Sequence, residues 1–365
     1  MGCSEGHSVG DAVSADLHPL TEDREIREMN VPAIDIYVTY RCNMRCRHCF
    51  VGDLLNTSQD MPRLLLEGII NEAKDKWATE ELVYLGGEPS LYPYLGEAIR
   101  ASHDSGYRVR LVSNGSTSLR RLLAADEYRR PLEISVSLDG ANVQQHDSIR
   151  RAGAFRGALD SVTEALARGH IVNAIISVGT HNISHALDTL QFLAEIGVES
   201  VSIHYVSNRG FADPSMPVDV EAWLEFRRQV IGLASPLRVR FERTFHDRGS
   251  PLRCAVQDRS MLMFFPDGRV FQCPMYLEGP NGHSFRWNGR QLEDNPHFST
   301  LYGAALTERS HCPAMKRINA ELCQRAERIN RKVGCVFDKE EIVGNELNGT
   351  HSLKGVVADV SAEAS

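Results

Sequence analysis

Residues 33–49 read AIDIYVTYRCNMRCRHC. The first seven of them are mostly apolar and β-branched, which is typical of a buried strand. Three cysteines, Cys42, Cys46 and Cys49, follow with the spacing C-x₃-C-x₂-C. The sequence therefore predicts a cysteine loop at the C-terminal end of a strand, which is where α/β barrels bind their ligands.

The strand pattern returns along the chain. Apolar, β-branched runs occur at 33–39, 81–85, 108–112, 132–138, 172–178 and 200–205. Stretches with helical spacing occur at 61–77, 93–105, 117–127, 155–168 and 183–196. Strands that alternate with helices predict a parallel sheet of the α/β class. Six such units favour a partial (β/α)6 TIM-like barrel, although the pattern alone also allows a doubly wound sheet.

The pattern changes beyond about residue 240. The segment MLMFFPDGRVFQC (261–273) contains the tight-turn signal Pro266-Asp267-Gly268 and predicts a hairpin. A cysteine-bearing helical stretch follows at 312–332. We expect a flexible polar leader over 1–30, a barrel domain over 31–240, a small domain of hairpin plus helix over 241–345, and a flexible tail over 346–365.

Composition narrows the classes of function. The 365 residues are 42% hydrophobic and 24% charged, which excludes a mostly disordered chain and a small disulfide scaffold. The net charge of −8 disfavours nucleic acid and anionic membranes as partners. The first 30 residues lack an apolar signal region, and no run of 18 apolar residues exists. We expect a cytoplasmic chain whose nine cysteines bind metal or do chemistry rather than form disulfides.

The first three cysteines suit a cubane iron–sulfur cluster. Three thiolates on one loop leave one iron without a protein ligand, and that iron can chelate a small molecule. A structural zinc site is the alternative, but zinc wants four protein ligands. His48 adjoins Cys49 and cannot easily reach the same metal. Three unrelated buried thiols are a further alternative.

Motifs at the later strand ends resemble those of the radical S-adenosylmethionine (SAM) superfamily, whose cysteine motif has the same spacing. The family's GGEP segment corresponds to Gly86-Gly87-Glu88-Pro89, and its TNG segment to Ser113-Asn114-Gly115. Its SLDG segment corresponds to Ser137-Leu138-Asp139-Gly140, and its HDxxR segment to His146-Asp147-Ser148-Ile149-Arg150. Asn182 matches a position that contacts the SAM ribose. The resemblance covers about residues 33–210. His48 departs from it, because the family usually has Tyr or Phe against the adenine, but a flat imidazole ring can still stack. Each glycine taken alone is also explained as an ordinary turn glycine.

This resemblance implies the cofactors and the chemistry. Cys42, Cys46 and Cys49 would hold a [4Fe–4S] cluster that binds SAM. The residues implied to contact SAM are Gly86, Gly87, Glu88, Pro89, Asn114, Ser137, Asp139, Arg150, Asn182 and His48. An external electron donor of the flavodoxin or ferredoxin type would reduce the cluster. Cleavage of SAM would then give a 5′-deoxyadenosyl radical that takes a hydrogen atom from the substrate.

The later cysteines resemble a second cluster site. The spacing from Cys254 through Gly268 to Cys273 matches the opening of SPASM and Twitch auxiliary-cluster domains. Five C-terminal cysteines cannot supply the seven thiolates of a full SPASM domain, so we expect one auxiliary cluster of the [4Fe–4S] type. Its expected ligands are Cys254, Cys273, Cys312 and then Cys335. Cys323 is interpreted as a core thiol or as a hydrogen-atom donor, and structural zinc is the alternative for this region.

The favoured function is an enzyme of specialised metabolism that oxidises or epimerises a small molecule. Its substrate would be a sugar, aminocyclitol, nucleoside or amino acid. The candidates to contact it are Cys323, Tyr205 and His204, the last two at the end of a predicted strand. A maturase of a ribosomal peptide is the alternative, although 30 residues are short for a leader-binding domain. A non-catalytic iron–sulfur or zinc protein leaves the GGEP and SLDG segments unexplained.

Overall fold

The computed structural model describes residues 29–57, 59–125, 130–233, 235–277, 281–298 and 310–343. The predicted tail lies outside these residues, as does the predicted leader up to residue 28. Within the described ranges, no helix is long and apolar enough to cross a membrane.

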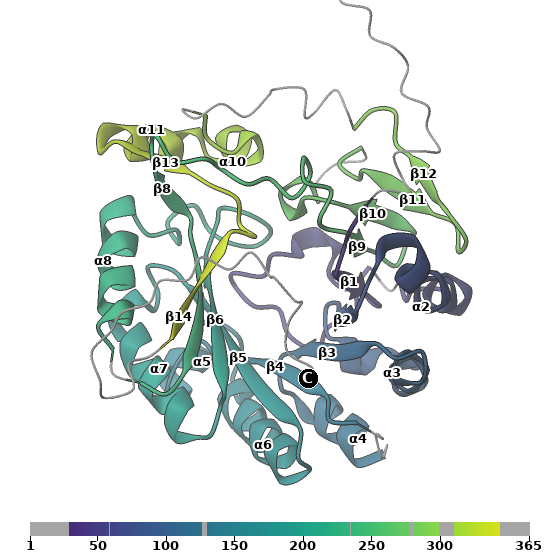
Figure 1. Ribbon diagram of the computed structural model, residues 1–365. Helices are drawn as coiled ribbons and strands as arrows, with labels where there is room; N and C mark the ends of the chain where they lie inside the picture. The colour runs from purple at the N-terminus through teal and green to yellow at the C-terminus, as the bar shows by residue number, and fades with distance from the viewer. Residues whose placement is uncertain are drawn as a thin grey trace, which may run out of the picture.

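A parallel sheet forms the predicted partial barrel. The six predicted strands are β1 (Ala33–Tyr37), β2 (Glu81–Leu85), β3 (Arg108–Ser113), β4 (Glu133–Ser137), β5 (Ile171–Val178) and β6 (Ser200–Tyr205). Each pairs in parallel with the next. A further parallel strand, β7 (Arg238–Glu242), follows β6, and β14 (Lys339–Val343) joins β7 in antiparallel orientation. Figure 1 shows these strands as an arc with the helices on its outer side.

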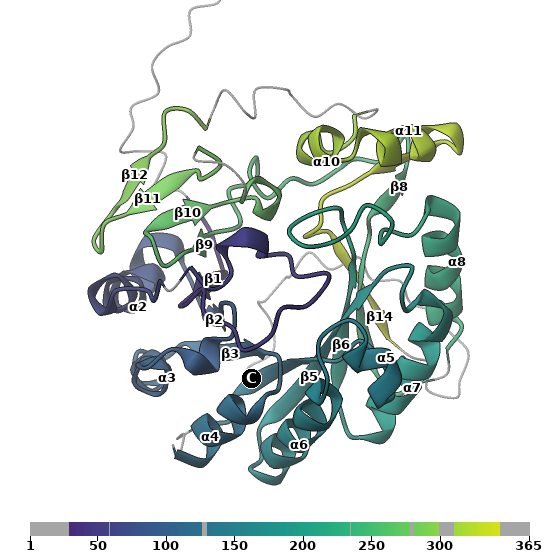
Figure 2. The ribbon, with the colours of Figure 1, turned by 180° about the vertical axis from the view of Figure 1, so that it is seen from behind.

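The helices cover the outer face of the arc in both views (Figures 1 and 2). They are α2 (Arg63–Trp77), α3 (Leu95–Asp104), α4 (Thr117–Ala125), α5 (Val143–Asp147), α6 (Ala154–Ala167), α7 (Ala186–Glu195) and α8 (Val220–Ile231). Five of them match the predicted stretches, whereas α5 and α8 were not predicted. The signal for α8 was present in the sequence, because the carboxylate of Asp219 caps it by accepting from the backbone N–H of Ala222 at 2.8 Å.

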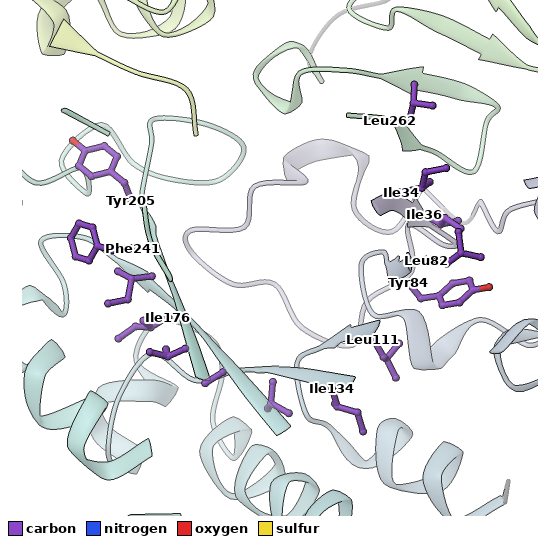
Figure 3. Close-up of a cluster of buried hydrophobic side chains, with 14 of the residues drawn as sticks. Ile34, Ile36, Leu82, Tyr84, Leu111, Ile134, Ile176, Tyr205, Phe241 and Leu262 are labelled. Carbon is purple, nitrogen blue, oxygen red and sulfur yellow. The ribbon is translucent and has the colours of Figure 1, made fainter. Parts of the chain in front are cut away.

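The two faces of the strands differ in chemistry. Side chains alternate between faces along a strand, and the outward set is apolar and buried against the helices. Figure 3 shows this set pointing away from the interior of the arc, for example Ile34, Leu111, Ile134 and Phe241. The inward set includes Asp35, Arg110, Ser135, Ser177, Ser202, His204 and Arg240. The interior of the barrel is therefore a cavity lined by both charged and apolar side chains, unlike the packed interior of a closed TIM barrel.

The C-terminal elements continue the same sheet. The predicted hairpin consists of β9 (Met263–Phe264) and β10 (Arg269–Phe271), and β9 pairs in parallel with β1. The strands β11 (Phe285–Trp287) and β12 (Leu292–Asp294) extend the sheet beyond β10, while β8 (Phe245–Asp247) pairs with β13 (Arg331–Val333). The predicted helical stretch is divided into α10 (Pro313–Ile318) and α11 (Ala320–Arg328). The predicted domain boundary near 240 falls inside β7, a strand of the barrel sheet.

Candidate functional site

The cysteine loop leaves the C-terminal end of β1 and is tied down by backbone bonds. The N–H of Cys42 donates to Asn56 Oδ1 at 2.8 Å, and the N–H of Cys49 donates to the carbonyl of Cys46 at 3.1 Å. The N–H of Arg47 donates to the carbonyl of Ile149 at 2.9 Å, which joins this loop to the segment after α5. These hydrogen bonds hold the loop, and with it the three cysteines, in place.

The three thiols lie close enough to interact electrostatically, and hydrogen-bond donors lie beside Cys42 and Cys46. Burial raises the pKa of Cys42 to about 12, and the thiolates of Cys46 and Cys49 are close enough to raise it too. The N–H of Met44 donates to Cys42 Sγ at 3.4 Å, and Asn114 Nδ2 lies 3.8 Å from the same sulfur. Partly buried thiols that repel each other as thiolates are stable only with a cation or hydrogen-bond donors beside them. This donor set therefore fits a positively charged metal cluster.

A site for a single metal ion needs a different arrangement of ligands. Among the described residues, no three His, Cys, Asp or Glu side chains are arranged to hold one metal ion.

The two glycines of the GGEP segment pack against the backbone that leads into the cysteine loop. A Cβ at Gly86 would lie 2.6 Å from the carbonyl oxygen of Thr39, and one at Gly87 would lie 2.4 Å from that of Arg41. The N–H of Gly87 donates to the carbonyl of Thr39 at 2.8 Å. Glycine is required here because the two chains approach too closely for any side chain.

Glu88 is a buried organiser of the next strand end. Its carboxylate accepts from the hydroxyl of Ser113 and from the N–H of Asn114, both at 2.8 Å. Burial raises its pKa, and these bonds oppose the rise. Pro89 follows as the first residue of a short 3-10 turn and is also buried. The carboxylate thus acts on the site through Asn114, which it holds beside Cys42.

A second buried carboxylate, Asp139, lies two residues after Ser137, which is the last residue of β4. Asp139 Oδ1 accepts from the N–H of Ser177 at 2.9 Å, and Oδ2 accepts from Arg150 Nε at 2.6 Å. Burial opposes its ionisation, but the Arg150 cation and the imidazoles of His48 and His146 outweigh burial and hold its pKa well below the usual range.

His48 faces this carboxylate from the cysteine loop. His48 Nε2 lies 3.5 Å from Asp139 Oδ2, and its ring stacks on His181 with centroids 5.9 Å apart. Burial lowers the pKa of His48 to about 4, so the ring is neutral. His48 Nδ1 and both ring nitrogens of His181 are buried without a hydrogen-bond partner among the described residues. Asn182 is fully buried nearby and donates to the carbonyl of Asp139.

Four of the later cysteines also meet. Cys254, Cys273, Cys312 and Cys335 line one small cavity together with Val336 and Phe337. Burial places the pKa of Cys273 well above the usual range, and the thiolates of Cys312, Cys335 and Cys254 raise it further. Four thiols around one cavity fit the ligand demand of a cubane cluster. Cys323 does not line this cavity and packs in the hydrophobic core from α11.

The two predicted substrate contacts on β6 point to opposite faces of the sheet. The ring of Tyr205 packs edge-on against Trp223 of α8, and its hydroxyl donates to the carbonyl of Val218 at 2.6 Å. The side chain of His204 lies in the barrel, where its Nε2 is 2.8 Å from Lys339 Nζ. Of this pair, only the His204 side chain is placed to contact a molecule in the barrel.

The barrel cavity measures about 440 Å³ and contains residues that sequence reasoning missed. Asp35, Arg240, Glu242 and Lys339 all line it. The signal was present in β7, which alternates charged and apolar residues over Arg238–Glu242, because a charged residue at every second position of a strand indicates a polar face. The cavity also reaches Val336 and Phe337, which line the four-cysteine site as well.

Comparison with known proteins matches the site to a family. The model of the radical SAM superfamily matches residues 36–204, which span the cysteine loop and all the strand-end motifs. Residues 36–204 of the chain form a radical SAM domain. The resemblance inferred from the motifs is thereby confirmed, and the cofactors of a radical SAM domain are a [4Fe–4S] cluster and SAM.

Individual radical SAM relatives match different lengths of the chain. The AdoMet-dependent heme synthase of Methanosarcina barkeri is 27% identical over 52% of this chain and 55% of its own length. The antilisterial bacteriocin subtilosin biosynthesis protein AlbA of Bacillus subtilis is 24% identical over 75% of this chain and 62% of its own. The chain therefore spans little more than half the length of these curated relatives.

A solved structure has the same fold. Streptococcus suis SuiB superposes with a TM-score of 0.62 over 79% of this chain and 72% of SuiB, at 13% identity. It has also been solved bound to precursor peptide SuiA. This likeness extends the agreement in fold beyond the residues that the family model matches.

Proposed function

We propose that this chain is a radical SAM enzyme that modifies a peptide. The observation that carries the proposal is the convergence of Cys42, Cys46 and Cys49 at the C-terminal end of β1, within the radical SAM match. When bound there, the cluster with SAM supplies one-electron cleavage of SAM and a 5′-deoxyadenosyl radical. An external donor of the flavodoxin or ferredoxin type provides the electron.

The chain's own residues position these cofactors. Asn114 and Arg150 place N–H donors beside the sulfurs of Cys42 and Cys46, at 3.8 and 3.9 Å. His48 and His181 offer a neutral, stacked pair of rings with unpartnered nitrogens, which suits a flat heteroaromatic ring such as adenine. Asp139 and Asn182, whose polar atoms are already bonded within the protein, shape the wall of this site.

The same proposal includes one auxiliary cluster held by Cys254, Cys273, Cys312 and Cys335. Because Val336 and Phe337 line both that site and the barrel cavity, the auxiliary cluster would lie next to the substrate. An electron released by the substrate could pass to it, so an oxidation is favoured over an isomerisation. Cys323 is proposed to be structural, since it lines neither cavity.

The length of the match favours a peptide substrate over a small molecule. The match to the heme synthase covers 202 residues, whereas the match to the bacteriocin biosynthesis protein covers 293. The longer match reaches well beyond the 169 residues, 36–204, of the family model. It therefore includes chain outside the domain that all radical SAM enzymes share. Our sequence-based preference for a small-molecule substrate is accordingly replaced by its alternative.

The test combines SAM cleavage with peptide mass. The reconstituted protein is reduced with dithionite under anaerobic conditions, and 5′-deoxyadenosine is measured by chromatography. The chain is then coexpressed with each short reading frame that flanks its gene, and the peptides are weighed by mass spectrometry. We expect a mass change in one peptide that disappears in a C42A variant. Cleavage of SAM without any modified peptide, together with turnover of a sugar or nucleoside, would contradict the peptide proposal and support a small-molecule substrate.

A further inference from the structure

The polar groups of the barrel cavity are unequally satisfied. Arg240 of β7 faces the cavity, and its guanidinium has no hydrogen bond or ion pair with any residue that the structure describes. Glu341 lies opposite Arg240 in the β7–β14 ladder, but the two form no ion pair within 4 Å. A guanidinium has five N–H donors in a fixed fork. Its donors are therefore available to a ligand in the cavity.

Lys339 stands beside Arg240 on the same inner face. Lys339 is the cross-strand partner of Glu242, so it lies diagonally from Arg240 across the two neighbouring strands. Among the residues that the structure describes, its Nζ has one close partner, His204 Nε2 at 2.8 Å. Burial and the Lys339 and Arg240 cations lower the pKa of His204, so the imidazole accepts this bond as a neutral ring. Further N–H bonds of the ammonium remain for a ligand.

The carboxylate of Glu242 does not supply the missing partner. It accepts from the N–H of Tyr205 and from the hydroxyl of Thr244, both at 3.2 Å. Burial raises its pKa to about 7, which weakens its negative charge near neutrality. The two cations are thus adjacent and only partly compensated.

From this arrangement we infer that the barrel cavity binds a carboxylate group of the substrate between Arg240 and Lys339. A carboxylate has two oxygens that match the guanidinium fork and leave lone pairs for an ammonium. Asp35, on the inner face of β1, also lines the cavity and makes no side-chain hydrogen bond with the described residues. A second negative charge on the ligand would be repelled by Asp35, so a carboxylate fits better than a phosphate.

This inference rests on the proposed function and names its substrate more closely. A peptide substrate would enter the barrel with an acidic side chain or its C-terminal carboxylate. A cavity of about 440 Å³ accommodates one or two residues, not a whole peptide. The modified residue would therefore lie close to the carboxylate in the peptide sequence.

The experiment measures binding rather than turnover. Reconstituted protein with SAM is titrated by ligand-observed NMR with N-acetyl-glutamate N-methylamide, with its uncharged glutamine analogue and with inorganic phosphate. We expect the glutamate probe to bind at least about tenfold more tightly than the glutamine probe, and more tightly than phosphate. R240Q should lower the affinity for the glutamate probe to that of the glutamine probe, and R240K should retain part of the preference.

The control is Arg238, which lies on the same strand two residues away and, like Arg240, is exposed, but does not line the cavity. R238Q should keep the wild-type preference. If R240Q does not fold, R240K and K339M test the inference instead. Each should lower the affinity for the glutamate probe but not the affinity for the glutamine probe. Equal binding of the glutamate and glutamine probes, or tighter binding of phosphate, would overturn the inference. Cleavage of SAM is scored separately: its absence with the carboxylate preference intact would count against the proposed function alone.

Discussion

Arg150 and Asp139 form an ion pair inside the barrel, with Arg150 Nε 2.6 Å from Asp139 Oδ2 and side chains 7% and 0% exposed. The same guanidinium extends Nη1 to within 3.9 Å of Cys46 Sγ. One cation therefore joins the end of β4 to the cysteine loop. Its pKa is raised, because the Asp139 carboxylate and the Cys46 thiolate outweigh its burial.

Removal of the Arg150 cation should destabilise the protein strongly. R150Q leaves a buried carboxylate without its counter-ion, and we expect a loss of about 3–5 kcal/mol in the free energy of unfolding by urea. The double variant R150Q/D139N should recover part of this loss. The exposed pair of Arg63 and Glu67 is the control, with side chains 54% and 47% exposed. R63Q should cost far less than R150Q, because solvent screens an exposed ion pair, and equal costs for the two variants would contradict a buried ion pair.

The first three cysteines should account for half of the iron. The wild-type protein, reconstituted anaerobically, should hold about eight irons and eight sulfides per chain. The variant with Cys42, Cys46 and Cys49 replaced by alanine should keep about four irons and form no 5′-deoxyadenosine. C323A, which removes a core thiol from α11, should keep all eight irons. Unchanged iron in the triple variant would contradict the assignment.

The auxiliary site should be separable from SAM cleavage. C273A removes one of the four thiols around the second cavity and should lower the iron content by up to about four. Uncoupled SAM cleavage by the dithionite-reduced variant should persist, while substrate oxidation should stop. A C273A protein that retains its fold and first cluster but has lost SAM cleavage would argue against an electron-accepting role.

Gly87 should tolerate no side chain. In G87A the new Cβ would meet the carbonyl of Arg41 at 2.4 Å, and backbone cannot yield as a flexible side chain does. We expect a loss of stability of about 1–3 kcal/mol and a displaced cysteine loop. Iron analysis should show loss from the first cluster only. G249A is the matched control, because a Cβ there meets nothing within 4 Å.

The buried imidazole of His146 should make the protein sensitive to acid. Burial and Arg150 lower its pKa to about 4, from 6.5. The unfolded chain then binds a proton below pH 6.5 that the folded chain does not, so stability is lost as pH falls from 6.5 toward 4. Between pH 7.5 and 5.5, H146N should lose about 1 kcal/mol less than the wild type in urea unfolding. An equal loss of stability in H146N and the wild type would contradict this prediction.

The barrel and the first cysteine loop were predictable because their signals are local. Each of the six strands begins within one residue of its predicted start, since a buried strand is a short apolar run bounded by turns. The four-cysteine set, which excludes Cys323, also came from spacing and from the hairpin turn at Gly268, and its role as a cluster site stays a prediction. Local pattern was sufficient wherever neighbouring residues fix the geometry.

The contacts within the barrel lining were not predictable, because they join strands far apart in the chain, although the alternation in β7 does indicate a polar face. Lys339 meets His204 across a separation of 135 residues, and nothing near either residue indicates the contact. The glycines of the GGEP segment were predicted to contact SAM. In the structure they also admit the Thr39–Arg41 backbone, a long-range approach that spacing does not reveal.

The pairing of β9 with β1 bears on how this protein can be divided for experiments. Met263 lies opposite Asp35 in that ladder, so the strand that carries the first cysteine loop has the C-terminal hairpin along its outer edge. A fragment that stops before residue 254 would leave that edge of β1 bare, with unpaired N–H and C=O groups able to template intermolecular β-pairing. The minimal expressible unit is therefore larger than the radical SAM match. A fragment cut there should precipitate, whereas the chain that retains the hairpin should stay dispersed at the same concentration.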